Sequence, residues 1–112
     1  MPTSNLTQPQ KEALLKTTLT ALDRKALRGV PHDWATLPQR VAKLSAYDPD
    51  LLRVAVRFCG SSGLLVGYSE NEQQFRFEEL STLGVYLAYG AAGRVVDTGS
   101  MLVYKQLFRM FK

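Results

Sequence analysis

The sequence predicts an α+β domain that is rich in helix. Three helices in a helix-turn-helix-like order are expected first, then one β-hairpin and two C-terminal helices, a layout that resembles a winged helix. Helix-capping residues precede apolar stripes of helical spacing, two short β-prone segments surround a polar turn, and apolar stretches fill the C-terminal part. The 112 residues, 46% of them hydrophobic, suit one globular domain over residues 7–112 behind a flexible tail of residues 1–6.

The first helix is expected to begin at Thr7 and to end near Gly29. Thr7 precedes Pro9 and Gln10, a capping pattern in which the threonine oxygen accepts from a free backbone N–H and Gln10 reaches back to the cap. Apolar residues then recur at helical spacing, at Leu15, Leu19, Leu22 and Ala26. Glycine is a common residue just beyond a helix, so Gly29 is the expected stop.

A connection over residues 30–35 leads to the second predicted helix. Thr36, Pro38 and Gln39 repeat the capping pattern, and the helix is expected to extend to about Ala46. Its apolar positions would face inward and its cations outward. A short turn then separates it from the third helix.

The third helix is expected to start at Asp48, which is a favourable cap, with Pro49 in the first helical position. Its apolar stripe consists of Leu52, Ala55, Val56 and Cys59. Apolar residues also alternate over residues 54–58, a pattern that fits a strand. The sequence therefore leaves open whether residues 51–59 form a helix or a strand.

A β-hairpin is expected after this segment. Residues 64–68 and 74–78 are short and β-prone, and the polar residues 69–73 separate them as a turn. Phe75 and Phe77 would share one face of the second strand, because side chains alternate across a strand. That face is expected to cover the core.

Two helices are expected at the C-terminal end. The first, over residues 79–96, carries several small residues that permit close packing against a neighbour. The second, from Met101 to Phe111, is amphipathic. Its apolar face holds Tyr104, Leu107, Phe108 and Phe111, and its polar face holds Lys105, Arg109 and Lys112.

The net charge of +4 and the pI near 9.4 permit an acidic partner such as nucleic acid. The single cysteine, Cys59, has no intramolecular disulfide partner, which favours a reducing compartment. The polar N-terminus lacks the apolar stretch of a signal peptide, and no segment approaches the ~20 apolar residues of a membrane span. We therefore expect a cytoplasmic protein.

Arginines and lysines fall on the second and third predicted helices and on the hairpin. The candidate nucleic-acid contacts are Arg40, Lys43, Arg53, Arg57 and Arg76. Arg53 and Arg57 stand four residues apart on one helix, where like charges repel each other unless an anion lies nearby. Phosphate groups would supply that anion. Against this, Asp48 and Asp50 place negative charge at the start of the same helix, and a solvated polar face is the alternative interpretation.

Residues 40–62 contain the series Arg40-Val41-Ala42, Leu52-Arg53, Ala55, Arg57 and Ser61-Ser62, and the predicted hairpin follows it. This stretch resembles the central part of the FinO/ProQ family of RNA-binding chaperones. The resemblance implies a small helical domain with a hairpin that binds structured RNA through a basic face. By the same resemblance, Arg53 and Arg57 would contact RNA.

The last predicted helix supports a different function. Its aromatic residues stand beside cations, which suits docking onto a protein partner or a membrane surface. The candidate partner-binding residues are Tyr104, Phe108, Phe111, Lys105 and Arg109. In this alternative the chain is a protein-interaction subunit or an inhibitor. The small residues around Gly84, Ala88 and Ala91 are a candidate homodimer interface, although internal close packing is the simpler role.

Catalytic chemistry has little support in the sequence. His32 is the only histidine and precedes Asp33, but no serine or cysteine nucleophile stands in a recognisable motif with it. One histidine and one cysteine cannot build a His/Cys zinc site, and the glycines match neither a phosphate loop nor a dinucleotide motif. We expect no enzyme activity, no metal and no cofactor. The expected ligand is DNA or RNA, held by its phosphate backbone, or else a protein.

Overall fold

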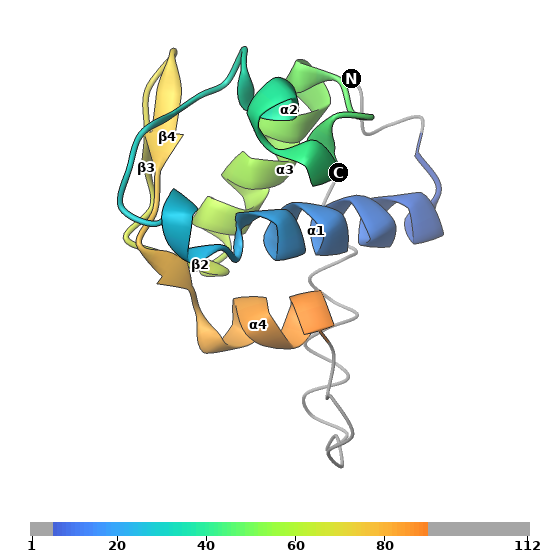
Figure 1. The fold of residues 1–112 in the computed structure, drawn as a ribbon. Coiled ribbons are helices and arrows are strands. Elements are labelled where there is room, and N and C mark those ends of the chain that lie inside the picture. Colours follow the sequence, from blue (N-terminus) through green and yellow to red (C-terminus); the bar gives the residue numbers. More distant parts are fainter. Residues whose placement is uncertain (1–5, 90–112) are drawn as a thin grey trace.

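The computed structural model of the protein describes residues 6–89 and has the predicted α+β class (Figure 1). Its longest helix, α1 (Gln8–Leu22), lies between α4 (Thr82–Tyr89) on one side and the pair α2 (Leu37–Arg40) and α3 (Pro49–Ser61) on the other (Figure 1). The short strands gather at one end of these helices. Within the described part of the chain, no helix combines the length and the apolar character that crossing a bilayer requires.

The strands form two small antiparallel ladders. Strand β4 (Gln74–Arg76) lies between β1 (His32–Asp33) and β3 (Ser69–Glu70), with His32 opposite Phe75. A second ladder joins β2 (Leu65–Val66) to β5 (Glu79–Leu80). The chain thus runs from a strand after α1, through α2 and α3, to a hairpin whose second strand returns to that first strand.

The capping residues predicted for α1 act as expected. Thr7 accepts a hydrogen bond from the Gln10 backbone N–H, and the Gln10 side chain accepts from the Thr7 backbone N–H. The helix ends at Leu22, however, and not near residue 28. Asp23 leaves the helical conformation, and a separate 3₁₀ turn, η2 (Lys25–Leu27), follows. The predicted length was wrong: the backbone of Asp23 leaves the helical region at ψ 62°, and its carboxylate binds Arg28 and Tyr89.

The second predicted helix is broken into two pieces. After α2, Val41 takes an extended conformation with φ −119° and ψ 106°, and the 3₁₀ turn η3 (Ala42–Leu44) follows. Val41 is buried, and a β-branched residue is easily accommodated in an extended backbone. Thr36 does not cap α2; its hydroxyl instead accepts from Nε of Arg40 at 3.0 Å.

Helix α3 settles the choice between helix and strand for residues 51–59. The side chain of Asp48 accepts from the Asp50 backbone N–H at 2.7 Å, as expected of the cap. The buried residues of α3 are Leu52, Ala55, Val56 and Cys59, which is the predicted stripe. The helical period therefore outweighs the short alternation over 54–58.

The strand pairing differs from the prediction in two ways. The expected connection over residues 30–35 contains β1, and the expected turn over residues 69–73 contains β3. The tight turn is shorter, because Oδ1 of Asn71 accepts from two backbone N–H groups that close it. Gly67, at φ +67°, interrupts the first arm of the hairpin between β2 and β3, and the register pairs residues 65–66 with β5 and not with β4.

Helix α4 starts three residues later than predicted. Residues 79–80 form β5, and the hydroxyl of Ser81 then accepts from the Gly84 backbone N–H at 3.0 Å, which caps the helix. Residues 90–96 of this predicted helix, and all of the final predicted helix over 101–111, lie outside the described residues.

One hydrophobic core joins α1, α3, α4 and the strands. Its centre is an aromatic cluster in which Phe75 stacks on Trp34 with 4.6 Å between ring centroids, and His32 lies 5.2 Å from the same phenyl ring. Phe75 and Phe77 are both buried, as the alternation predicted. The core thus fixes the strands against the helices and leaves the cationic residues around its edge.

Candidate nucleic-acid interface

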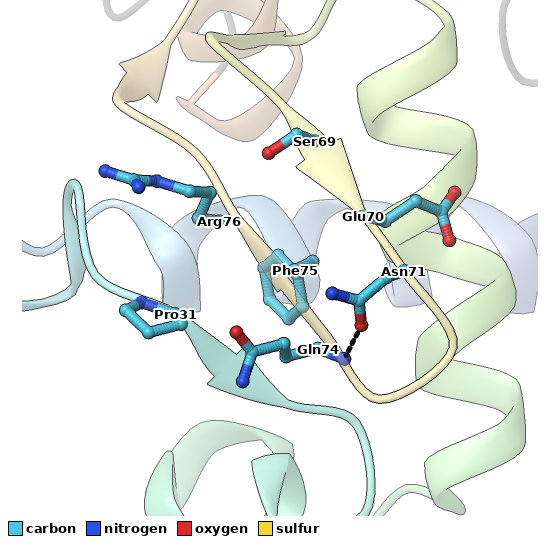
Figure 2. Close-up of a pocket in the computed structure, with 7 residues that line it drawn as sticks. All are labelled: Pro31, Ser69, Glu70, Asn71, Gln74, Phe75 and Arg76. Carbon is cyan, nitrogen blue, oxygen red and sulfur yellow. Dashed lines mark hydrogen bonds between the residues drawn. The ribbon is translucent and has the colours of Figure 1, made fainter.

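Arg57 is already paired within the protein. Its Nε and Nη2 groups donate to both carboxylate oxygens of Glu70 at 2.9 to 3.0 Å, and this hydrogen bonding raises the pKa of Arg57. Figure 2 shows the Glu70 side chain reaching from β3 toward α3. The charge of Arg57 is therefore balanced by a carboxylate, and a phosphate would have to compete for it.

Arg53 packs flat against the core. Its guanidinium carbon lies 5.2 Å from the centroid of the Trp34 ring, and its Nε is buried. The residue lines a groove of about 590 Å³ between the start of α3 and the hairpin turn. The same groove holds three carboxylates, those of Asp33, Asp50 and Glu72. This excess of negative charge opposes phosphate binding around Arg53.

Arg76 holds the hairpin to the segment that follows η2. Its Nη2 donates to the carbonyl oxygen of Gly29 at 3.0 Å. Figure 2 shows its guanidinium directed away from the other side chains around a hollow of about 100 Å³ on β3 and β4. In the same view, the oxygen of Asn71 faces the backbone of Gln74, to which it is hydrogen-bonded. Most of the polar side chains around this hollow are already hydrogen-bonded to other groups of the protein.

Arg40 and Lys43 stand on opposite sides of the break in the second predicted helix. Both are exposed, and Arg40 uses only its Nε in the bond to Thr36. Lys43 faces a cleft of about 380 Å³, here named the α1–η3 cleft. The cleft is lined by Thr20, Ala21, Asp23, Arg24, Val41, Ala42, Lys43 and Tyr89.

Three elements build the α1–η3 cleft. The end of α1 supplies Thr20 and Ala21, and Asp23 and Arg24 follow directly after this helix. The turn into η3 supplies Val41 to Lys43, and Tyr89 is the last residue of α4. These segments are held together because the buried faces of α1 and α4 share the core. The cleft is therefore a product of the tertiary fold and not of one helix.

The charge balance of the α1–η3 cleft favours an anion. The Asp23 carboxylate accepts from Nη2 of Arg28 at 3.0 Å and from the hydroxyl of Tyr89 at 2.7 Å, so both of its oxygens are used. Arg24 and Lys43 are exposed, and neither side chain has a hydrogen-bond or ion-pair partner among residues 6–89. Two free cations thus border a cleft whose one carboxylate is already neutralised by a cation.

The five predicted contacts do not line one surface. Lys43 lines the α1–η3 cleft, Arg53 the acidic groove and Arg76 the hairpin hollow, while Arg57 is bound to Glu70. Arg24 belongs to the basic stretch that the sequence shows between residues 24 and 57 but is not among the five predicted contacts, and sequence reasoning did not identify Tyr89. Residues 6–89 contain ten lysines and arginines against nine aspartates and glutamates, so it is the local pairing of charges that distinguishes the cleft.

Comparison of the chain with family models, curated proteins and solved structures finds no match. The resemblance of residues 40–62 to the FinO/ProQ family therefore stays a prediction. The residues of the alternative partner-binding surface, over 104–111, lie outside the described part. The geometry of the α1–η3 cleft is consequently the main basis for a functional proposal.

The two residues considered for chemistry are both buried in the core. His32 is 1% exposed, and its Nε2 lies 2.8 Å from the carbonyl oxygen of Leu27. Cys59 is fully buried, which raises the pKa of its thiol to about 12 and keeps it protonated. Among residues 6–89, no group of three or more potential metal-ligating side chains is arranged around a common point. Neither His32 nor Cys59 lines the α1–η3 cleft.

Protonation of His32 is expected to destabilise the fold. Burial among Phe75 and Phe77 lowers the pKa of His32 below its ordinary value of 6.5, so the unfolded chain binds the proton more readily. Stability is then fully present above about pH 6.5 and falls as the pH decreases toward the folded-state pKa, by at most about 1.4 kcal/mol per pH unit for one proton. Urea unfolding between pH 7 and pH 5 measures this slope.

The matched variant for this experiment is His32→Gln, which keeps a donor for the Leu27 carbonyl but does not titrate. We expect it to be less stable at every pH, yet to show a smaller loss between pH 6.5 and pH 5. An equal pH slope in both proteins would show that His32 does not cause the effect.

Proposed function

We propose that the protein binds nucleic acid through the α1–η3 cleft, with Arg24 and Lys43 as contacts to the phosphate backbone. The observation that carries this proposal is the charge pairing within the cleft. Asp23 is held by Arg28 and Tyr89, while Arg24 and Lys43 have no partner among the described residues. Cations that are left exposed in a concave site lower their free energy when an anion approaches.

Arg40 is the natural extension of this surface. It stands three residues before Lys43, is exposed, and has N–H donors beyond the Nε that binds Thr36. The proposal therefore retains two of the predicted contacts, Arg40 and Lys43, and adds Arg24. It assigns structural roles to the other three predicted contacts, because each already has a partner within the protein. Arg53 contacts an aromatic ring, Arg57 a carboxylate and Arg76 a backbone carbonyl group.

The winged-helix layout supports the proposal only as an analogy of fold, since one fold serves many functions. In helix-turn-helix proteins the second helix of the motif usually enters the major groove. Here the corresponding helix, α3, begins with Asp48 and Asp50, and its Arg57 is paired. Binding through the α1–η3 cleft would accordingly place a different edge of the domain against the nucleic acid.

A protein partner is the second candidate function, and one observation favours it. Val85 and Tyr89 stand four residues apart on α4 and are 43% and 50% exposed. Such a pair on one helix face suits an apolar partner surface. The aromatic residues predicted to bind a partner, over 104–111, lie outside the described residues. Under this candidate, a copurifying protein or a concentration-dependent oligomer accompanies the purified protein.

Fluorescence anisotropy tests the proposal with labelled single-stranded RNA, single-stranded DNA and duplex DNA over a range of salt concentrations. The double variant Arg24→Gln/Lys43→Gln removes both cations of the cleft. We expect weaker binding and a shallower dependence of the logarithm of affinity on the logarithm of salt. For each phosphate that the variant no longer neutralises, the slope should fall by about 0.7 on a single strand and by about 0.9 on duplex DNA.

The control is Lys11→Gln/Arg57→Gln. It also removes two positive charges, but at positions that do not line the cleft. It should keep the salt slope of the unmodified protein. Equal losses in both double variants would show that net charge alone governs binding, and would refute the assignment to the cleft. Absence of binding to every probe at low salt would refute nucleic-acid binding and favour the protein partner.

A further inference from the structure

Tyr89 is an exposed aromatic ring inside the proposed binding site. It lines the α1–η3 cleft together with Arg24 and Lys43 and is 50% exposed. The other large hydrophobic residues that are exposed to a comparable degree, Val30, Val66 and Val85, do not line this cleft. Within residues 6–89, an exposed aromatic ring therefore lies in the same cleft as two cations that have no partner in that part of the chain.

The position of this ring is fixed at one edge. The hydroxyl of Tyr89 donates to Oδ2 of Asp23 at 2.7 Å, and Arg28 donates to the other oxygen of the same carboxylate at 3.0 Å. The hydrogen bond raises the pKa of Tyr89, so the phenol stays protonated and keeps its donor. An aromatic side chain has few torsions to restrict, and a ring that is already held loses little entropy when a ligand packs on it.

We propose that the α1–η3 cleft binds single-stranded nucleic acid, with an unpaired base stacked on Tyr89 and the adjacent phosphates on Arg24 and Lys43. This inference rests on the proposed function and narrows its ligand. Proteins that bind single strands combine cations along the backbone with aromatic rings that receive bases. A base within a duplex is stacked between its neighbours and offers no free face to such a ring.

The size of the cleft agrees with this class of ligand. Its volume of about 380 Å³ is at the lower end of the range for small-molecule sites, which suits one nucleotide. Its cations come from two separate segments, the connection between α1 and η2 and the 3₁₀ turn η3, so phosphates on either side of the stacked base can each meet a positive charge. Recognition through stacking and phosphate contacts predicts little preference for base sequence.

The test compares three probes of equal phosphate number in the unmodified protein: a 12-nucleotide RNA of mixed sequence, the same strand with abasic sites, and an RNA duplex. We expect the intact single strand to bind more tightly than the other two. Tyr89→Leu should weaken binding of the intact strand by roughly five- to a hundred-fold, which is the range for loss of one stacked base. It should leave the salt dependence unchanged, because the cations remain.

Tyr89→Phe keeps the ring without its hydrogen bond to Asp23, and should retain most of the preference for the intact strand. Val85→Ala changes the other exposed residue of α4 and serves as the control outside the cleft. Equal affinity for the intact and abasic strands would overturn base stacking while phosphate binding stands. If circular dichroism shows that Tyr89→Leu is unstable, base stacking is still tested by the comparison of the intact and abasic strands, in the unmodified protein and in Tyr89→Phe. Absence of binding to all probes would refute the proposed function itself.

Discussion

Phe75→Ala is expected to lower the free energy of unfolding by about 3–5 kcal/mol. Phe75 is 1% exposed, and its ring stacks on Trp34 at 4.6 Å between centroids and lies 5.2 Å from His32. It stands on β4, the strand that joins β1 to β3. Truncation leaves a cavity at the point where the sheet meets the helices. Domains of this size have only about 5–15 kcal/mol of stability in total, so the loss is a large share.

Urea unfolding followed by fluorescence measures this effect directly, because Trp34 is the only tryptophan and contacts the deleted ring. Val30→Ala is the control, since Val30 is 42% exposed and its truncation should change stability by less than about 0.5 kcal/mol. A loss below about 1 kcal/mol in Phe75→Ala would contradict the central place given to this ring.

Gly84→Ala is expected to destabilise the protein by about 1–3 kcal/mol, although alanine is the better helix former. A Cβ atom at this position would collide with the carbonyl oxygen of Leu64. That oxygen belongs to the backbone and also accepts a hydrogen bond from the Ser81 N–H, so it cannot easily move aside. Helix α4 would have to shift, and Tyr89 would shift with it. We therefore expect weaker binding of nucleic acid as well as lower stability.

Chemical denaturation of Gly84→Ala beside Val85→Ala separates packing from helix propensity. Val85 is an exposed neighbour on α4, and alanine there should alter stability by less than about 0.5 kcal/mol. If Gly84→Ala proves more stable than the unmodified protein, the higher helix propensity of alanine outweighs the steric effect. The close approach of α4 to Leu64 then does not require glycine at this position.

Features that depend on neighbours in the sequence were predictable. The reciprocal hydrogen bonds of Thr7 and Gln10, and the Asp48 cap, each join residues two or three positions apart, and the sequence indicates them. The buried stripe of α3 likewise follows from a helical period within one segment. The α+β class results from these local signals together with the alternation at Phe75 and Phe77.

Features that depend on distant partners were not predictable in the same way. Strand β1 pairs with β4, with His32 opposite Phe75, and residues 30–35 contain no run of β-prone residues that indicates a strand. The break at Val41 coincides with the burial of its side chain in the shared core, and the capping pattern at Thr36 gives no sign of it. Tertiary contacts decided both cases.

In the candidate site, too, the residue types were predictable from the sequence and their tertiary partners were not. Sequence reasoning identifies cations, among them Arg40 and Lys43, but not the partners they find after folding. Arg57 meets Glu70 across 13 residues, and Tyr89 meets Asp23 across 66. The first contact pairs one cation with a carboxylate, and the second, together with Arg28, occupies both oxygens of the carboxylate beside two other cations. The number and positions of cations in the sequence do not show which of them are paired after folding.

The hydrogen bond between Tyr89 and Asp23 also has a consequence for the timing of activity during synthesis. The cleft needs the end of α1, the turn into η3 and the last residue of α4 at once. A growing chain on the ribosome cannot complete the cleft until Tyr89 has emerged, so an incomplete product should not compete for ligand. Once formed, the cleft links occupancy to global stability: a ligand present at 100 times its Kd adds about 2.7 kcal/mol to the folded state.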